Sequence, residues 1–205
     1  MLKTMKLPKQ AKLVLTGKIF SVYQWPQKMF DGSTATFERV IRQNTVVIIP
    51  IMDGKVVTVK QKQPGTDWYY DLPSGRMDKK GEVPKNAALR ELLEETGLKP
   101  KTLKLWKTYS PSGKVIQKVY FFIARDCVKV AKQKLDPGEK IEPAYKTFDQ
   151  FLELSDHPRC FFGPLMIDVL LARIHPENRQ YLEESFFDAW QQPHKMPKKG
   201  PKSNW

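Results

Sequence analysis

Three glutamates recur at helical spacing in the run RELLEETGL, which extends from Arg90 to Leu98. They are Glu91, Glu94 and Glu95. On an α-helix, residues three and four apart share one face, so we expect the three carboxylates to meet there. Like charges on adjacent turns repel one another unless a cation lies among them. Carboxylate oxygens suit Mg²⁺ or Mn²⁺, which keep other positions for water and substrate phosphate. The run predicts a divalent-metal site or, as the alternative, a solvated helix face on which Arg90 pairs with Glu94.

A helix over residues 84–96 would carry these side chains. Pro84 fits the first turn of a helix, alanines at 87 and 88 favour its continuation, and Gly97 fits the residue just past its end. We expect the leucines of this helix to enter the core and the glutamates to stay outside it. These leucines are Leu89, Leu92 and Leu93.

A glycine and a further glutamate precede this helix at characteristic distances. This pattern resembles the Nudix box at each of the fixed positions that follow its glycine. Glu82 is followed by seven residues and then by the run from Arg90 to Leu98. The family usually has five residues between the glycine and the first glutamate, whereas six separate Gly75 from Glu82 here. We place the extra residue at Lys79 or Lys80, in a turn, where an insertion is better tolerated than in a helix.

The resemblance to the Nudix family implies the chemistry of the site. It implies a hydrolase that uses Mg²⁺ or Mn²⁺ to cleave the diphosphate of a nucleoside diphosphate linked to another moiety. The implied metal ligands are Glu91, Glu94, Glu95 and the backbone carbonyl of Ser74. The implied catalytic residues are Glu91, Glu139, Arg90 and Glu82, with Arg90 and Glu82 paired to orient helix and loop. Relatives place a general base or further ligand in the polar loop 132–142, where we prefer Glu139 to Glu142 because structured chain resumes near Ile141.

Three further features resemble the ADP-ribose and nucleotide-sugar branch of the family. Residues 72–75 read Leu-Pro-Ser-Gly and follow Asp71, where the branch usually has Glu. Pro111 resembles a proline that the branch has after the box, although a plain Ser-Pro-Ser-Gly turn is the alternative. The strands of residues 12–42 resemble the leading strands with which the branch forms homodimers and contacts the base. The implied substrate-binding residues are Arg39, Tyr23, Trp25 and Pro111, and core or interface packing is the alternative for the two aromatics.

ADP-ribose or another nucleotide sugar is therefore the expected substrate, with a nucleoside monophosphate and a sugar phosphate as products. Nucleoside triphosphates, dinucleoside polyphosphates, coenzyme A and RNA ends remain alternatives, because specificity lies outside the box. A basic nucleic-acid-binding protein is the alternative from another class. The net charge of +13, with 35 Lys and Arg against 22 Asp and Glu, suits either a phosphorylated substrate or nucleic acid.

The remaining pattern predicts a mixed α+β chain. β-Branched or alternating runs predict strands at 12–25, 36–42, 45–50, 55–61, 102–109 and 115–124. Helices are expected at 147–154, 164–174 and 177–192, the last with Phe186, Phe187 and Trp190 on its apolar side. With the family resemblance, the prediction is the Nudix fold, an α/β/α sandwich with a mixed sheet and an N-terminal β-hairpin extension. Expected domains are an N-terminal extension (1–11), the Nudix hydrolase domain (12–192) and a basic disordered tail (193–205).

Composition narrows the setting of the protein. The sequence contains no run of about 18 apolar residues, which a membrane-spanning helix would need. Residues 1–13 lack the apolar segment of a signal peptide. We therefore expect a cytoplasmic protein without membrane association. The two cysteines, Cys127 and Cys160, are too few for a disulfide framework, and we expect both to be reduced. The three histidines show no ligand spacing.

Overall fold

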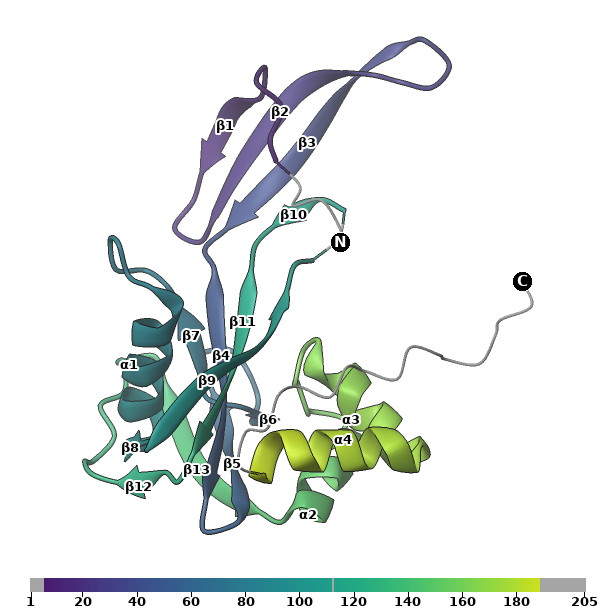
Figure 1. Cartoon of the computed structure of the whole chain (residues 1–205). Helices are drawn as coiled ribbons and strands as arrows, with labels where there is room; N and C mark the ends of the chain where they lie inside the picture. The colour runs from purple at the N-terminus through teal and green to yellow at the C-terminus, as the bar shows by residue number, and fades with distance from the viewer. Residues whose placement is uncertain (1–5, 112, 189–205) are drawn as a thin grey trace.

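The strands divide into a small N-terminal sheet and a larger sheet that carries the helices (Figure 1). The structure is a computed structural model that describes residues 6–111 and 113–188. The small sheet has the order β1-β2-β3-β10 and projects from the rest of the molecule. Its strands are β1 (Lys12–Thr16), β2 (Phe20–Lys28), β3 (Thr34–Arg42) and β10 (Val115–Ile116). Because β10 comes from the middle of the chain and pairs with β3, it ties this sheet to the larger one.

The larger sheet has the order β13-β5-β4-β11-β9 and is mixed, because β4 and β11 run parallel while the other neighbours are antiparallel. Its strands are β4 (Thr45–Met52), β5 (Lys55–Lys62), β9 (Thr102–Tyr109), β11 (Val119–Arg125) and β13 (Lys140–Lys146). Two short strands, β6 (Tyr69–Asp71) and β7 (Ser74–Arg76), pair with β5 and β4 respectively. A separate pair joins β8 (Leu98–Lys99) to β12 (Val128–Lys129).

Helices cover the larger sheet on both faces (Figure 1). On one face lies α1 (Pro84–Thr96), and on the other lie α2 (Phe148–Glu153), the 3-10 turn η1 (Leu154–Asp156), α3 (Leu165–Ile174) and α4 (Pro176–Phe187). Alternation along β4 supplies both cores, since Ile48 packs towards α1 while Ile49 packs towards α3 and α4. The predicted mixed α+β architecture, with helices on both sides of a mixed sheet, is confirmed.

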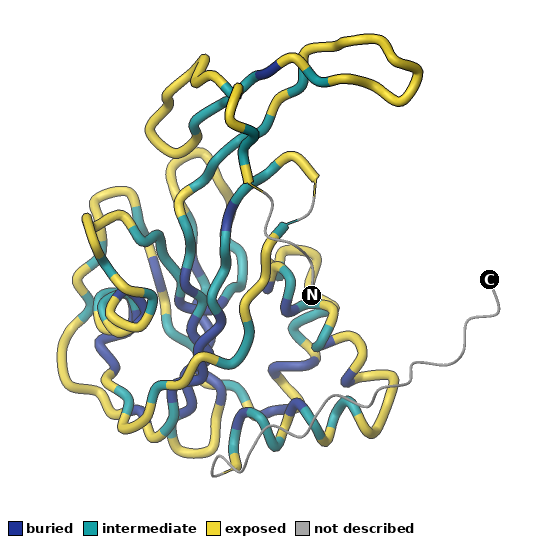
Figure 2. Tube along the Cα trace, turned by 45° about the horizontal axis from the view of Figure 1, so that its top comes forward, coloured by how far each residue is buried: buried dark blue, intermediate teal, exposed yellow. Residues whose placement is uncertain are grey.

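Burial is concentrated in the larger sheet and its helices, whereas the N-terminal sheet is mostly exposed or half-buried (Figure 2). None of the helices in the described ranges combines the length and the apolar character that a membrane crossing requires. Cys127 and Cys160 are both free thiols. Trp190 and the predicted tail at 193–205 lie outside the described residues, and the predicted domain boundaries stay predictions.

Two strand predictions needed correction. The first strand region was expected to end before Pro26, but β2 continues to Lys28. Pro26 is tolerated because β1 pairs with β2 only as far as Gln24, so the missing N–H interrupts no hydrogen bond to β1. The predicted strand 115–124 is two strands, β10 and β11, which belong to different sheets.

The expectation that the leucines of α1 are buried and its glutamates excluded from the core is partly wrong. Leu92 is fully buried, but Leu89 and Leu93 are 36% and 40% exposed. The buried stripe runs through Ala88, Leu92 and Glu95, at the spacings of four and seven that define one helix face. Glu95 is therefore part of the buried surface of the helix.

Candidate active site

Local signals in the chain fix the ends of α1. Pro84 occupies the first turn, where a backbone N–H would have no partner within the helix, so the lack of an N–H in proline costs no hydrogen bond. Gly97 ends the helix in the left-handed conformation, with φ of 67°, and its N–H donates to the carbonyl of Leu93. A Cβ at Gly97 would lie 2.1 Å from the carbonyl oxygen of Ala131, so the chain beyond the helix requires a glycine there. These ends confirm the predicted helix.

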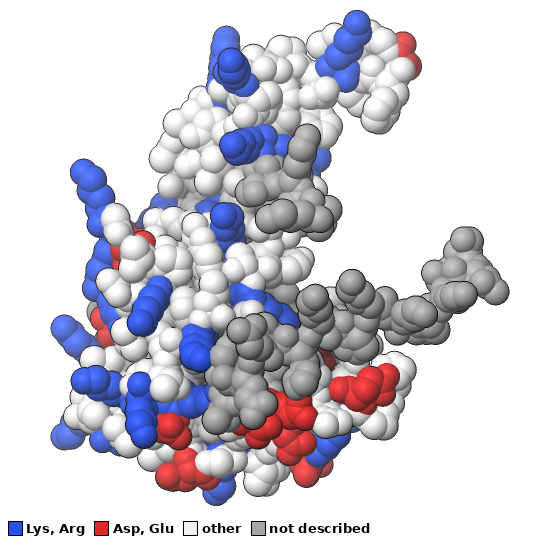
Figure 3. Space-filling model, in the orientation of Figure 1, with Lys and Arg blue, Asp and Glu red and all other residues white. Residues whose placement is uncertain are grey.

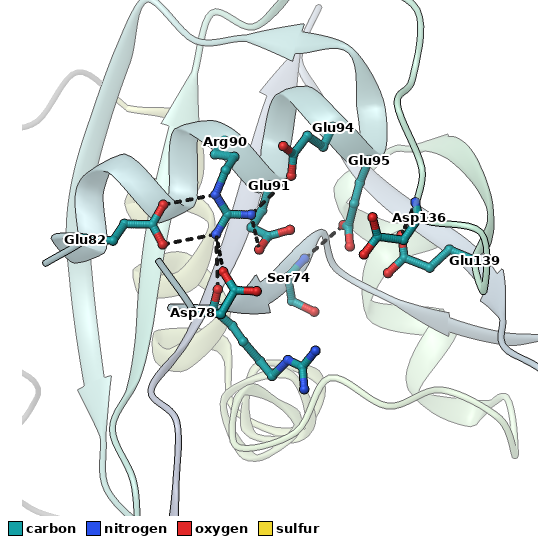
Figure 4. A network of polar contacts seen from close by, with 10 residues as sticks. Ser74, Asp78, Glu82, Arg90, Glu91, Glu94, Glu95, Asp136 and Glu139 are labelled. Atoms are coloured by element: carbon teal, nitrogen blue, oxygen red, sulfur yellow. Dashed lines mark hydrogen bonds and ion pairs between the residues drawn. The ribbon is translucent and has the colours of Figure 1, made fainter. Parts of the chain in front are cut away.

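Arg90 is the centre of the polar network on α1 (Figure 4). Its guanidinium forms a two-pronged pair with Glu82, in which Nε donates to Oε1 at 2.9 Å and Nη2 donates to Oε2 at 3.1 Å. Nη1 donates to Glu91 at 2.7 Å and to Glu94 at 3.1 Å, and Nη2 also donates to the carbonyl of Arg76 at 3.1 Å. The pair with Glu94 that a solvated face would have is therefore present, but it is one contact of several.

These contacts change the acidity of both partners. The hydrogen bond from Arg90 holds the pKa of Glu82 below its usual value, against a smaller opposing effect of burial. The hydrogen bond to Glu82 in turn raises the pKa of Arg90. Glu82 therefore remains ionised and ties the loop that precedes α1 to the helix.

Glu91 lies directly against the glycine loop. An added Cβ at Gly75 would be only 1.9 Å from Cδ of Glu91 and 2.0 Å from its Oε1. The carboxyl group of Glu91 therefore occupies the space that a side chain at position 75 would need. Burial raises the pKa of Glu91 to about 7, although the positive charge of Arg90 opposes this rise.

Glu95 is the most enclosed carboxylate of the cluster. Its Oε2 accepts a hydrogen bond from the backbone N–H of Ser74 at 3.0 Å. Burial raises the pKa of Glu95 well above its ordinary value, the Ser74 N–H opposes this, and the charges of Glu91, Glu139 and Asp71 add to it. Ser74 thus contacts the cluster through its N–H, while the role of its carbonyl as a metal ligand stays a prediction.

The loop before β13 brings one of the two predicted glutamates to this cluster. Glu139 lies beside Glu95 together with Asp136, whose backbone N–H donates to Glu139 at 3.2 Å (Figure 4). The side-chain amide of Gln133 holds the loop to α1 by donating to the backbone carbonyl of Glu95. Glu142, in contrast, is an exposed residue of β13 opposite Lys60 of β5.

The sequence assigned no role to two further polar residues of β6, Asp71 and Tyr69. The carboxyl group of Asp71, a half-buried residue, accepts a hydrogen bond from the N–H of Leu72 at 2.7 Å, and its partial burial raises its pKa to about 7. Tyr69, two residues earlier on β6, has its pKa raised by burial and then by the charges of Asp71, Glu95 and Glu139. Side chains two residues apart on a strand lie on the same face of the sheet, so the sequence could have indicated that Tyr69 shares the face of Asp71.

The predicted substrate-binding residues of the N-terminal sheet lie on strands that project away from α1 (Figure 1). Tyr23 is opposite Arg39 in the β2–β3 register. Trp25 is only 4% exposed, with its ring centroid 5.4 Å from that of Phe37 and the Arg39 guanidinium 5.6 Å from its ring. Pro111 lies between β9 and β10, at the end of β9 that leads to the N-terminal sheet. Within one chain, these residues are not brought together with the glutamates.

The donor set fits a hard divalent cation. Among residues 6–111 and 113–188, no three acidic, histidine or cysteine side chains form a ready cage for an ion. Mg²⁺ does not need such a cage, because it binds through one or two carboxylates and completes its shell with water and phosphate. Glu91 and Glu95 are carboxyl groups whose burial disfavours the charged form, and a cation between them would compensate for that cost.

A mixed sheet between helices, with a glutamate-bearing helix packed against a glycine loop, is the arrangement of a known domain family. Residues 41–162 match the family description "NUDIX domain", and the chain belongs to the NUDIX family of pyrophosphohydrolases. Members of this family typically use a divalent metal ion.

Individual relatives are similar over most of the chain. An ADP-ribose pyrophosphatase of Bacillus subtilis is 32% identical over 145 residues, which cover 69% of this chain and 78% of the relative. An ADP-ribose pyrophosphatase of Methanocaldococcus jannaschii is 27% identical over 72% of this chain and 87% of the relative. A methanol dehydrogenase activator of Bacillus methanolicus is 26% identical over 76% of this chain and 86% of the relative. A crystal structure of an ADP compounds hydrolase has the same fold, with a TM-score of 0.67 and 21% identity over 83% of this chain and 94% of that one.

Proposed function

We propose that the chain hydrolyses the diphosphate bond of ADP-ribose or another nucleotide sugar to a nucleoside monophosphate and a sugar phosphate. The observation that carries the proposal is the carboxylate cluster of α1, held by Arg90 and packed against the loop of Gly75. Two relatives at 27% and 32% identity are named ADP-ribose pyrophosphatases, which favours this substrate over other diphosphates. The Leu-Pro-Ser-Gly run before the box favours the same branch.

Mg²⁺ or Mn²⁺ is the proposed cofactor, held by Glu91, Glu94, Glu95 and the carbonyl of Ser74. When bound, a divalent ion neutralises phosphate oxygens and lowers the pKa of a bound water. The role of Arg90 and Glu82 is positional, because their two-pronged pair fixes the loop against the helix. Arg90 also directs the carboxylate of Glu91, to which it donates at 2.7 Å.

Glu139 is the proposed general base. Its loop is fastened to α1, and the N–H of Asp136 orients its carboxylate beside Glu95. In Figure 4, Glu139 lies on the side of Glu95 that faces away from Arg90, so its carboxylate is not engaged by that cation. This position suits the removal of a proton from the attacking water.

The charge distribution supports an anionic substrate. In the view of Figure 3, Lys and Arg side chains are spread over the N-terminal sheet and down the left side of the molecule, and at the lower edge they adjoin Asp and Glu side chains. A positive field of this kind attracts a diphosphate. Nucleic acid stays the less favoured partner. A protein that binds RNA through its lysines should be retained on RNA in a steeply salt-dependent way, so a flat response to salt concentration would exclude this alternative.

A homodimer through the N-terminal strands is the proposed assembly. Apolar side chains on β1 and β2 are about half exposed, among them Leu13 at 52%, Leu15 at 55% and Phe20 at 44%. A second copy that covers them could also bring Arg39, Tyr23 and Trp25 towards a substrate. Sedimentation of the wild type and of the double variant Leu13→Asp/Leu15→Asp tests this, since only the wild type should behave as a dimer.

The decisive experiment combines substrate choice with removal of the carboxylates. A panel of ADP-ribose, other nucleotide sugars, dinucleoside polyphosphates and nucleoside triphosphates is assayed with Mg²⁺ for released monophosphate. We expect ADP-ribose to be the best substrate and a chelator to abolish its turnover. The double variant Glu94→Gln/Glu95→Gln should lose at least about a hundredfold in kcat, because these ligands support charge stabilisation in the transition state. Glu183→Gln on α4 is the control, and undiminished turnover in the double variant would end the assignment.

A further inference from the structure

The last turn of α1 ends in backbone carbonyl groups that have no partner within the helix. Residues 129–134 supply the donors for three of them: the N–H of Lys134 donates to Glu94 at 2.9 Å, the side-chain amide of Gln133 donates to Glu95, and Nζ of Lys129 donates to Thr96. Residues 129–134 therefore cap the helix that carries the glutamates, and the loop that follows them starts from a fixed point.

The side chain of Gln133 has a second contact, which reaches the strand after the loop. Its amide also donates to the backbone carbonyl of Ile141 on β13, at 2.9 Å. A side-chain amide carries two hydrogens, so it can serve both carbonyls at once. Ile141 is 4% exposed and lies opposite Gln61 of β5, and its carbonyl therefore belongs to a firmly packed strand. Gln133 thus joins the end of α1 to the start of β13 and closes the loop 134–140 at its base.

Glu139 belongs to this closed loop, two residues before Ile141. Within the loop, the N–H of Glu139 donates to the carbonyl of Asp136 at 2.9 Å, and the N–H of Asp136 donates to the Glu139 carboxylate at 3.2 Å. These two contacts shape the loop, but both are internal to it.

The attachment of the loop to α1 comes from two neighbouring residues, Gln133 and Lys134. Lys134 contributes a backbone N–H, which any residue except proline would supply. Gln133 contributes a side chain, so its contact depends on the residue type. Because Figure 4 shows Glu139 beside Glu95, the residue whose backbone carbonyl accepts the Gln133 amide, this contact bears on how the two carboxylates lie relative to each other.

We propose that Gln133 is a positioning residue for the reaction, which holds the carboxylate of Glu139 in place against the glutamates of α1. The inference rests on the proposed function, in which Glu139 is the general base. A general base must lie within hydrogen-bond reach of the proton that it removes. A misplacement of about 1 Å can cost about a hundredfold in rate, so a side chain that fixes the loop of the base affects kcat without touching the substrate.

Three variants separate this role from a general loss of stability. Gln133→Met keeps an unbranched side chain of similar length but donates no hydrogen bond, whereas Gln133→Lys keeps a donor of at least the same reach. Gln117→Met is the matched control. The Gln117 amide also bridges two acceptors, the carbonyl of Gln43 at 3.0 Å and Oγ1 of Thr45 at 2.9 Å, but it lies between β10 and β11.

The kinetic test is a double-mutant cycle with Glu139→Gln. We expect Gln133→Met to lower kcat for ADP-ribose with Mg²⁺ about tenfold, and Gln133→Lys to stay within about threefold of the wild type. In the Glu139→Gln background, Gln133→Met should change kcat by less than about twofold, because a base that is absent cannot be misplaced. Gln117→Met should keep kcat within about twofold, although its melting temperature should fall at least as far as that of Gln133→Met, since Gln117 is the more buried residue.

Two kinetic results would overturn the role of Gln133. One is an unchanged kcat in Gln133→Met, and the other is a tenfold loss that recurs undiminished in the Glu139→Gln background, which would mean that Gln133 does not act through Glu139.

Hydrogen exchange of the backbone amides of residues 134–139 gives a second readout that does not require turnover. These amides should exchange at least about tenfold faster in Gln133→Met than in the wild type, and at the wild-type rate in Gln117→Met. If the wild type does not hydrolyse ADP-ribose, the proposed function fails, and hydrogen exchange tests the attachment of the loop separately. Unchanged exchange in Gln133→Met would reject the attachment, and faster exchange confined to this loop would support it.

Discussion

Gly75 and Glu91 occupy adjoining space so closely that a Cβ on residue 75 would lie 2.0 Å from Oε1 of Glu91. This glycine is not explained by an unusual backbone angle, because its φ is not in the left-handed region. It is explained by the carboxyl group that lies against it. The helix and the loop of the box therefore fit together through one carboxylate and one missing side chain.

Gly75→Ala should consequently impair activity far more than stability. The added methyl group forces the Glu91 carboxylate to move, and a misplacement of about 1 Å at a catalytic group can cost about a hundredfold in rate. We expect kcat for Mg²⁺-dependent hydrolysis to fall by about that factor, with a melting temperature close to that of the wild type. Gly138→Ala is the control, because its added Cβ meets only Pro64 at 3.8 Å. A fully active Gly75→Ala enzyme would contradict this account of the glycine.

Arg90 should contribute to stability as well as to the site. Its removal leaves the carboxylates of Glu82 and Glu91 without their cation in a largely enclosed setting. Breaking one partner of such a buried pair commonly costs about 3 kcal/mol, whereas an exposed pair contributes less than about 1 kcal/mol. Urea unfolding should therefore show a much larger loss for Arg90→Ala than for Arg173→Ala, which breaks the exposed pair with Asp156.

Arg90→Lys should recover only part of that loss, because an ammonium group cannot reproduce the two-pronged contact with Glu82. Equal destabilisation by Arg90→Ala and Arg173→Ala would mean that the network around Arg90 adds nothing beyond a surface ion pair.

Asp71 should make the metal-free protein less stable as pH rises. Burial raises its pKa from 3.8 to about 7, so the folded chain keeps a proton that the unfolded chain releases. The stability associated with this proton is fully present below pH about 4 and is lost progressively up to pH about 7, by an amount on the order of a few kcal/mol.

Unfolding with urea in the presence of a chelator, at several pH values, measures this dependence. Asp71→Asn removes the titrating group at nearly constant shape, and we expect it to flatten the decline between pH 4 and 7. A decline of the same size in the variant would assign the effect to other carboxyl groups of the cluster.

The sequence predicted the local parts of this site and missed the parts that depend on distant pairing. Pro84 and Gly97 mark the ends of α1 within their own turns, and so the helix was predicted with its correct bounds. The burial of Glu95 depends on how α1 packs against β7, which its leucine spacing did not reveal. The N–H of Ser74 reaches Glu95 only because β7 pairs with β4, where Ser74 lies opposite Val47. Such long-range pairing leaves no periodic signal in the segment itself.

Glu139 and Glu142 offer a comparison in which the same substitution is made three residues apart. Glu139 lies in the loop beside Glu95, while Glu142 is exposed on β13 opposite Lys60. Loss of a general base commonly lowers the rate by about 10²- to 10⁴-fold, so Glu139→Gln should reduce kcat by at least a hundredfold with little change in melting temperature. Glu142→Gln should remain within about twofold of the wild type. Steady-state kinetics with ADP-ribose and Mg²⁺ measures both variants, and a large loss confined to Glu142→Gln would move the base from the loop to the strand.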